Sequence, residues 1–346
     1  MVMLLKSSGK RLALACTVLL MMCSCLVLPD PRIEWWNEYT EGDYEGGIAV
    51  GVLPDSGICV FVFALAGSYE QNRSCRLIKY SPSGKRMWAK NYALDFFSYD
   101  LGGFIDHAGC PVLLESHTSR SRVVRFDTAG TPVWKSREFP YLVYSMAETE
   151  DGNIVLVGSD SGSVVHMMSP TGDSIWTARI DSLGAFYGVA ASSRGEVVCR
   201  GVNGMVSFDS HGEVIAGLHI TGFGGLCIDS HDLLAVGTDD GWMLRLRVDC
   251  TFVDSFPMPE GGWSLMTLDR EDNIILARSA YGPTRYDHSS IIEVMKVDGQ
   301  CREMSSAVGG NWSTANPKAV TACPDGSAVV TGWCPGGTFT LKANLH

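Results

Sequence analysis

The feature that most constrains this chain is a four-strand pattern that recurs along nearly its whole length. The clearest copy follows Tyr144 and reads SMAETE-DGNIVLVG-SDSG-SVVHMMSPTGDSIWTARI. Short apolar runs alternate with turn pairs such as Asp151-Gly152 and Thr171-Gly172. Glycine tolerates positive φ, and Asp and Thr side chains bond to nearby backbone, so these pairs end strands. The pattern therefore predicts four consecutive strands, called A to D here, with Trp176 on strand D.

Copies of this unit can be aligned at the first residue of strand B. These positions are spaced 36 to 54 residues apart and are Ile58, Cys110, Asn153, Glu196, Asp232, Asn273 and Ser327. Repeats of ~40–50 residues with four strands each are typical of β-propellers. The sequence therefore predicts an all-β fold, a seven-bladed β-propeller of four-stranded antiparallel blades.

The two ends of the chain complement each other. The last copy stops after its strand C, at 338–342, and therefore lacks a strand D. A spare strand resembling D, RIEWWNEY, lies at Arg32 to Tyr39. Pairing this N-terminal strand into the last blade would close the ring and remove the open sheet edges. We therefore expect the propeller to span residues 32–346.

The N-terminus has the pattern of an export signal. Lys6, Lys10 and Arg11 precede an apolar stretch at 12–28, which is the layout of a secretory signal. Within it, Met22-Cys23-Ser24-Cys25 resembles a bacterial lipobox and predicts lipidation of Cys25. We expect a signal at 1–25, a tether at 26–31 and a membrane-anchored lipoprotein of the cell envelope. Plain cleavage and an uncleaved anchor remain alternatives, since 17 apolar residues approach the length that spans a bilayer.

Charge and cysteine content narrow the choices further. The formal net charge is −11, which argues against a nucleic-acid partner because phosphate binding needs clustered Lys and Arg. The sequence has no CxxC pair, so a zinc ribbon is not supported. Cys59, Cys199 and Cys227 lie in apolar strands and are interpreted as small buried hydrophobes. Cys323 and Cys334 bracket one predicted hairpin and are the favoured disulfide.

Strands C and D carry a resemblance to a known family. Segments such as RLIKYSPSG and RVVRFDTAG are followed by a tryptophan four residues after the glycine, at Trp88, Trp134 and Trp176. These repeats resemble the PQQ-like, WD40-like propellers related to bacterial quinoproteins. The resemblance implies that these tryptophans hold neighbouring blades together without binding the cofactor. The later copies have Ala216 and Glu303 instead, and no vicinal cysteine pair is present, so we expect no cofactor.

Catalytic and metal motifs are not evident. The sequence has no GxSxG or HExxH segment, so we nominate no catalytic residue and no metal ligand. His107, His211 and His231 fall at expected turns and are interpreted as solvated. An Asp-box glycosidase is rejected, because the turn before Trp176 lacks the aspartate and has the wrong spacing.

An aromatic residue precedes strand A in each copy. Strand A is innermost in a propeller, so its entry loops surround one mouth of the central channel. Aromatics there could form a collar that binds a glycan, a peptide or a protein. The alternative is that each ring packs between blades as part of the repeat. The candidate collar consists of Tyr44, Tyr99, Tyr144, Tyr187, Phe223, Trp263 and Trp312.

Function can only be ranked from these observations. The first hypothesis is a non-catalytic binding or scaffold propeller that recognises a protein, peptide or glycan through the strand A entry face. Additional aromatics, Phe96, Phe97, Tyr141 and Phe186, draw attention to blades two to four of that face. The second is an enzyme, either a degenerate quinoprotein or a lyase or hydrolase with residues on loops. The third is a sensor ectodomain held by an uncleaved anchor.

Overall fold

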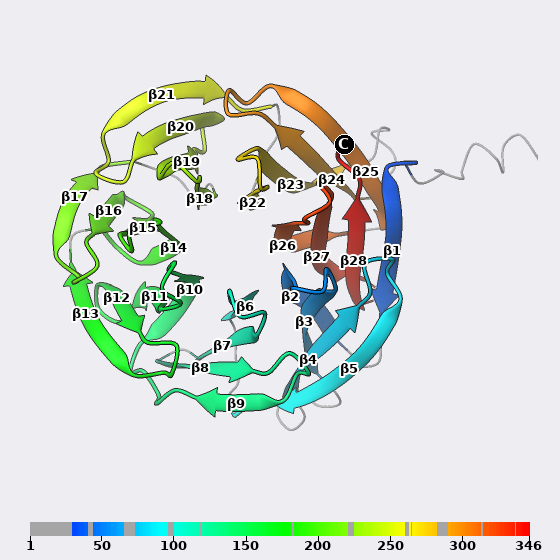
Figure 1. Cartoon of the computed structure of the whole chain (residues 1–346), viewed down its shortest axis with the longest axis horizontal. Coiled ribbons are helices and arrows are strands. Elements are labelled where there is room, and N and C mark those ends of the chain that lie inside the picture. Colours follow the sequence, from blue (N-terminus) through cyan, green and yellow to red (C-terminus); the bar gives the residue numbers. More distant parts are fainter. Residues whose placement is uncertain are drawn as a thin grey trace, which may run out of the picture.

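The computed structural model shows a closed ring of seven four-stranded sheets around a central axis (Figure 1). The seven-bladed propeller predicted from the repeat is thereby confirmed. The structure describes residues 30–40, 44–65, 73–95, 100–117, 119–181, 183–220, 225–259, 263, 265–281, 290–312, 314–335 and 337–346. No helix in these ranges has the length and hydropathy needed to cross a membrane.

Each blade is a meander, with strand A nearest the axis and strand D at the rim (Figure 1). The strands of blades 1 to 3 are β2(Tyr44–Val52), β3(Ile58–Leu65), β4(Arg73–Tyr80), β5(Arg86–Ala93); β6(Asp100–Ile105), β7(Pro111–His117), β8(Arg120–Phe126), β9(Pro132–Lys135); and β10(Leu142–Glu148), β11(Ile154–Ser159), β12(Ser163–Met168), β13(Ser174–Ile180). Those of blades 4 and 5 are β14(Phe186–Ala191), β15(Val197–Gly201), β16(Met205–Phe208), β17(Val214–Leu218); and β18(Leu226–Ile228), β19(Leu233–Gly237), β20(Trp242–Arg247), β21(Phe252–Pro257). Those of blades 6 and 7 are β22(Leu265–Leu268), β23(Ile274–Tyr281), β24(Ser290–Val297), β25(Glu303–Trp312); and β26(Asn316–Ala322), β27(Ala328–Cys334), β28(Gly337–Ala343), β1(Ile33–Tyr39).

The N-terminal strand closes the ring as predicted. β1 pairs antiparallel with β28, with Trp36 opposite Leu341. The buried ammonium of Lys342 lies 2.9 Å from the Glu34 carboxylate on β1 and 2.7 Å from the Asp325 carboxylate in the turn before β27. One cation therefore links the N-terminal strand to the C-terminal blade.

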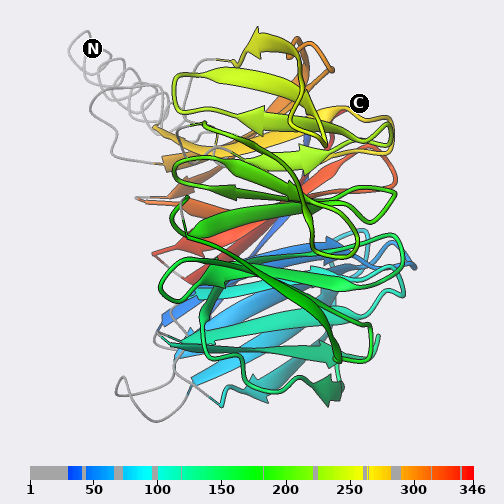
Figure 2. The same ribbon diagram turned by 90° about the vertical axis from the view of Figure 1, so that its left-hand side faces the viewer.

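Strand B begins where the repeat predicts, within one residue. In blade 3 the turn is closed by the backbone bond from Thr149 to Asn153, at 2.9 Å, and β11 follows at once. The A–B and C–D turns lie on one side of the disc seen edge-on in Figure 2, called the A–B face. The B–C hairpins and D–A connections lie on the opposite side, called the D–A face. Strand A enters from the D–A face.

The core lies between blades rather than inside any one of them. Strands B and C are buried on both faces; every residue of β12, for example, is buried. One apolar cluster joins Val50 and Ile58 of blade 1 to Val329 of blade 7, and other clusters bridge neighbouring blades similarly. A single blade therefore leaves apolar surface that only its neighbours cover.

The tryptophans of strand D pack across blade boundaries. The indole N–H of Trp134 donates to the Pro170 carbonyl, and that of Trp176 to the Ser210 carbonyl, both at 3.0 Å. Each acceptor belongs to the C–D turn of the next blade. Trp35 on β1 does the same toward Pro82 in blade 1. These indole groups therefore link neighbouring blades at the rim of the propeller.

The structure corrects the alignment in the later blades. There, Cys250 and Cys301 take the positive-φ turn position, with φ of 61° and 57°, that glycine takes elsewhere. Counting four residues onward places Asp254 and Ser305 at the tryptophan position. The prediction that Glu303 stands at the tryptophan position is therefore wrong, because it counted from Gly299 and the turn residue with positive φ is Cys301.

The favoured disulfide is also wrong. Cys323 and Cys334 are both buried free thiols. Cys334 ends β27, a strand of seven residues, and Cys323 lies in the turn that precedes that strand. At about 3.3 Å per residue, their Cα atoms are far beyond the ~7 Å limit for a disulfide. Cys59 and Cys199 are buried free thiols in strands, as expected, and burial raises the pKa of Cys59 to about 12.

Candidate functional site

The entry end of strand A contains a β-bulge in several blades. The register shifts between Val143 and Ser145 in blade 3, and between Phe186 and Gly188 in blade 4. The residue left without a ladder partner is Tyr144 in one blade and Tyr187 in the other. A bulge redirects the side chain of the extra residue. The two rings meet across the blade boundary with centroids 4.6 Å apart and planes inclined at 42°.

This tyrosine pair is partly open to solvent. Tyr187 is 43% exposed, and Tyr144 is half-buried beside it. Both rings lie at the channel end of the D–A face because they sit near the beginning of the innermost strand. The repeat predicted both rings just before strand A, whereas the structure places Tyr144 and Tyr187 inside it, at the bulges of β10 and β14. Their contact with each other depends on the packing of two blades.

Other blades place different residues at this bulge. Ile48 occupies it in blade 1 and an exposed lysine, Lys318, in blade 7. Tyr44 begins β2 and Trp312 ends β25, but their side chains are not among those described. Tyr99 and Phe223 lie outside the described residues. The described bulge positions therefore carry two tyrosines, an isoleucine and a lysine.

Trp263 packs in the core and not at the channel mouth. It is only 7% exposed and packs in the cluster between blades 5 and 6. Its indole N–H donates to the Pro259 carbonyl at 2.9 Å, and the Arg278 guanidinium lies 4.5 Å from its ring centroid. Relative to the A–B turn it is one position earlier than Tyr187, which matches the buried Phe186. Trp263 lies before β22 begins at Leu265, at the position of the buried Phe186 and not at that of the bulged Tyr187.

Two of the additional aromatics also serve the core. Tyr141 and Phe186 are 4% and 0% exposed. Burial raises the pKa of the Tyr141 hydroxyl, whose oxygen has no hydrogen-bond partner among the described residues. Phe96 and Phe97 lie outside the described residues. The aromatic excess in blades 2 to 4 is therefore partly structural.

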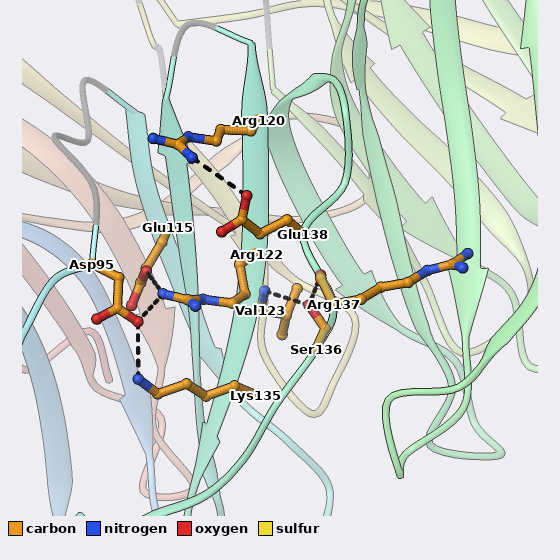
Figure 3. Close-up of polar contacts among 9 residues, drawn as sticks. All are labelled: Asp95, Glu115, Arg120, Arg122, Val123, Lys135, Ser136, Arg137 and Glu138. Carbon is orange, nitrogen blue, oxygen red and sulfur yellow. Dashed lines mark hydrogen bonds and ion pairs between the residues drawn. The ribbon is translucent and has the colours of Figure 1, made fainter.

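A charged network lies near the D–A face between blades 1 and 2 (Figure 3). The fully buried carboxylate of Glu115 is 2.8 Å from the Arg122 guanidinium. Arg122 also contacts Asp95, which lies 3.0 Å from the Lys135 ammonium. Nearby, burial and the negative charge of Glu115 raise the pKa of the Tyr92 phenol. The sequence signal for this network is Glu115, an ionisable residue inside the apolar run PVLLESH. It was not among the residues predicted to form a site.

A large cavity opens at the other mouth. It has a volume of about 1050 Å³ and is lined by the inner strands and A–B turns of blades 1, 2, 6 and 7, with Ser145 of blade 3. His107 lines it, with its side chain 59% exposed. The Glu148 carboxylate accepts the backbone N–H of His107 at 2.8 Å. Burial raises the pKa of Glu148, and that hydrogen bond opposes the rise.

The remaining candidates for chemistry are dispersed. His211 and His231 lie at turns with side chains 84% and 77% exposed, as their sequence context predicted. Within the described ranges, no group of three or more His, Cys, Asp or Glu side chains is arranged to hold a metal ion. The geometry presents an aromatic pair at one mouth and a cavity at the other.

Comparison with known proteins supports the fold alone. No family model and no curated sequence matches the chain. Among solved structures, a catalytically inactive variant of virginiamycin B lyase from Staphylococcus aureus with quinupristin is 12% identical, with a TM-score of 0.61 over 89% of this chain and 99% of that one. The WD40 β-propeller domain of Doa1 is 10% identical, with a TM-score of 0.64 over 91% and 97% of the two chains. These likenesses agree with the seven-bladed architecture.

Proposed function

We propose that this protein is a non-catalytic binding propeller whose D–A face recognises a protein or peptide, with a glycan as the other ligand class. The observation that carries the proposal is the bulge pair, Tyr144 and Tyr187. In two adjacent blades the unpaired strand A residue is an aromatic ring, and the two rings meet at the channel mouth. Tyrosine combines a wide apolar face with a polar tip, and is therefore enriched in recognition surfaces.

The test uses peptide and glycan arrays probed with three forms of the protein. The double variant Tyr144→Ala/Tyr187→Ala should lose the spots that the wild type binds. Phe252→Ala is the matched control, because Phe252 is 59% exposed on the outer strand, away from the mouth. Equal loss in both variants, or unchanged binding in the double variant, contradicts the proposal.

We also propose that the propeller is held at the cell envelope through a lipidated Cys25, and that its repeats descend from the PQQ-like group. The support is the basic, apolar and lipobox-like order of the first 25 residues. Mass spectrometry of the N-terminal peptide tests the anchor. An acylated Cys25 is expected, and Cys25→Ser should release the protein from membranes. An intact Met1 would instead support an uncleaved anchor.

A second candidate is a lyase, favoured by His107, which lines the 1050 Å³ cavity, and by Glu148, which accepts the His107 backbone N–H and lines with it a smaller cavity of about 290 Å³. A carboxyl group of raised pKa beside an exposed imidazole is suited to proton transfer. The virginiamycin B lyase solved with quinupristin supplies a substrate to try. Conversion of quinupristin by the wild type but not by His107→Ala, followed by liquid chromatography with tandem mass spectrometry, would support this candidate. If the wild type leaves quinupristin unchanged, the proposal of a lyase acting on this compound is contradicted.

A further inference from the structure

The outermost strand of each blade has one edge that no other strand in the described ranges pairs with (Figure 1). Such an edge exposes backbone N–H and C=O groups and can accept a further strand, which proteins discourage by placing charged side chains or proline on it. Six of the seven outer strands contain at least one charged residue. Examples, one from each strand, are Glu34 in β1, Arg86 in β5, Lys135 in β9, Arg179 in β13, Asp254 in β21 and Glu303 in β25.

The outer strand of blade 4, β17, is the exception. Its sequence is VIAGL, with neither a charge nor a proline. Val214 is 54% exposed and Ile215 is 41% exposed, so two large apolar side chains of this strand face solvent. Its length is that of an ordinary strand in a sheet, so pairing can extend along the whole edge. An uncharged, apolar, exposed edge of this kind favours pairing with another strand.

Polar groups of opposite character lie just beyond the two ends of β17. Glu213 precedes the strand and His219 follows it, and both residues are exposed. A second copy of β17 that pairs antiparallel about Ala216 places Glu213 of each copy opposite His219 of the other. An imidazole donates a hydrogen bond to a carboxylate when neutral and forms an ion pair with it when protonated. The edge is therefore complementary to itself at both ends.

Two other outer strands show what charges do to the same arrangement. In β5, the residue equivalent to Ala216 is Trp88, and pairing about it would place Arg86 opposite Lys90. Like charges directly opposite each other destabilise a strand pair. In β13, the residue at the position of His219 is Arg179, whose guanidinium already contacts the Asp160 carboxylate. β17 therefore differs from both strands in having an uncharged edge between two exposed, complementary groups.

We propose that β17 pairs antiparallel with β17 of a second copy of this chain, in a dimer whose twofold axis passes beside Ala216. Each copy uses the same edge, so the assembly closes at two chains and does not grow into a filament. Because paired strands run in opposite directions, the D–A faces of the two copies point in opposite directions. The inference does not depend on the Tyr144–Tyr187 pair, which lies on the innermost strands.

Disulfide cross-linking of the full chain tests the register of this pairing. Ala216→Cys places each new thiol opposite its own copy, at a Cα spacing within the range of a disulfide. Val214→Cys is the matched control, because it is more exposed but lies opposite Leu218, about 13 Å along the strand from its own copy. Under mild oxidation, Ala216→Cys should give at least about fivefold more cross-linked dimer than Val214→Cys. The wild type measures the background from the native cysteines.

A charge exchange tests the two ends of the strand. Glu213→Lys places an ammonium beside each His219, and sedimentation velocity in detergent solution should show self-association about tenfold weaker, since the dimer contains two such pairs. Glu213→Lys/His219→Glu restores opposite charges and should recover the association. Glu150→Lys is the matched control, because it reverses one exposed charge in an A–B turn of blade 3 and should leave association unchanged.

Hydrogen exchange distinguishes a second copy from another strand on the same edge. The amides of β17 should exchange more slowly at high than at low protein concentration. The occupant is a separate strand, and the dimer proposal is wrong, if concentration has no effect and only the added peptide EVIAGLH, the sequence of residues 213–219, slows their exchange. Equal cross-linking of Ala216→Cys and Val214→Cys, or a charge exchange that does not recover association, also overturns the proposal.

Discussion

Two arcs of the ring are held together by different contacts. From blade 7 round to blade 4, a tryptophan on the outer strand packs on the C–D turn of the next blade. From blade 4 to blade 6, an aspartate of one A–B turn binds the A–B turn of the preceding blade instead. Asp232 accepts the backbone N–H and the hydroxyl of Ser193, both at 2.8 Å, and Asp272 binds Ser230 in the same way.

The comparison shows that tryptophan and glycine act as a pair. A Cβ on Gly84 would lie 2.5 Å from the Trp35 ring, and one on Gly212 would lie 2.7 Å from the Trp176 ring. Docking therefore requires a bare backbone under the indole. Where Ala216 and Asp254 replace the tryptophan, Cys250 and Cys301 occupy the turn position despite positive φ. Losing the ring removes the steric need for glycine.

Replacing a docking ring should have the largest effect. Trp176→Ala removes the ring over Gly212 and its bond to Ser210, and we expect a loss of about 3 kcal/mol in unfolding free energy. Urea denaturation measures it. Phe252→Ala on the outer strand of the other arc, where Phe252 is 59% exposed, should cost less than about 0.5 kcal/mol. Similar losses in both variants would mean that tryptophan docking does not distinguish the arcs.

Acid should weaken the tryptophan-docked arc through His166. Burial mainly, and then the nearby Arg137, lower the pKa of His166 from 6.5 to about 4. Its Nδ1 lies 2.7 Å from the Thr177 hydroxyl, and its ring lies 4.8 Å from that of Phe139 at the blade 2–3 boundary. Because the folded-state pKa is depressed, this stability is complete above pH 6.5 and is lost as pH falls toward 4.

The expected loss at pH 5 is about 2 kcal/mol relative to pH 7.5. Urea denaturation at both pH values measures it, and hydrogen exchange should show blades 2 and 3 losing protection first. His166→Gln should remove this part of the pH dependence. A variant with the full wild-type slope would assign the acid sensitivity to other groups.

The aspartate contacts should stabilise the ring less than a tryptophan does. Asp272→Ala leaves the Ser230 N–H and hydroxyl without their acceptor, and we expect a loss of about 1–2 kcal/mol. The matched control is Asp151→Ala, an exposed residue of the corresponding turn in blade 3 that makes no such contact between blades in the described structure. Thermal denaturation of both variants tests it; equal losses would contradict a bridging role for Asp272.

The smallest effect should come from transferring one arc's contact to the other. Ala216→Trp alone places an indole against the Cβ of Cys250, and Cys250→Gly alone removes a side chain without adding a ring. Together they restore the tryptophan–glycine pair, so we expect a favourable coupling of about 1 kcal/mol in a double-mutant cycle. Strict additivity of the two changes would show that the turn of blade 5 cannot accept a docked ring.

Much of the architecture could be read from the sequence because it is written locally and repeated. Turn residues such as Asp151-Gly152 recur at each joint, and their need for positive φ or side-chain bonds is a property of a few neighbouring residues. Seven copies, a missing last strand and a spare first strand together predicted both the blade number and the closure by β1. Trp88, Trp134 and Trp176 were identified because their spacing from the turn glycine is constant.

The tertiary structure decided what depends on the offset of a single residue or on contact between two blades. Trp263 and Tyr187 look alike in the repeat, but Trp263 lies at the buried position of Phe186, one residue earlier, whereas Tyr187 is the extra residue of a bulge that redirects its side chain to the mouth. The contact between the Tyr144 and Tyr187 rings likewise arises only where blades 3 and 4 pack against each other. A local pattern specifies each blade, whereas the surfaces between blades arise from side chains that lie far apart in the sequence.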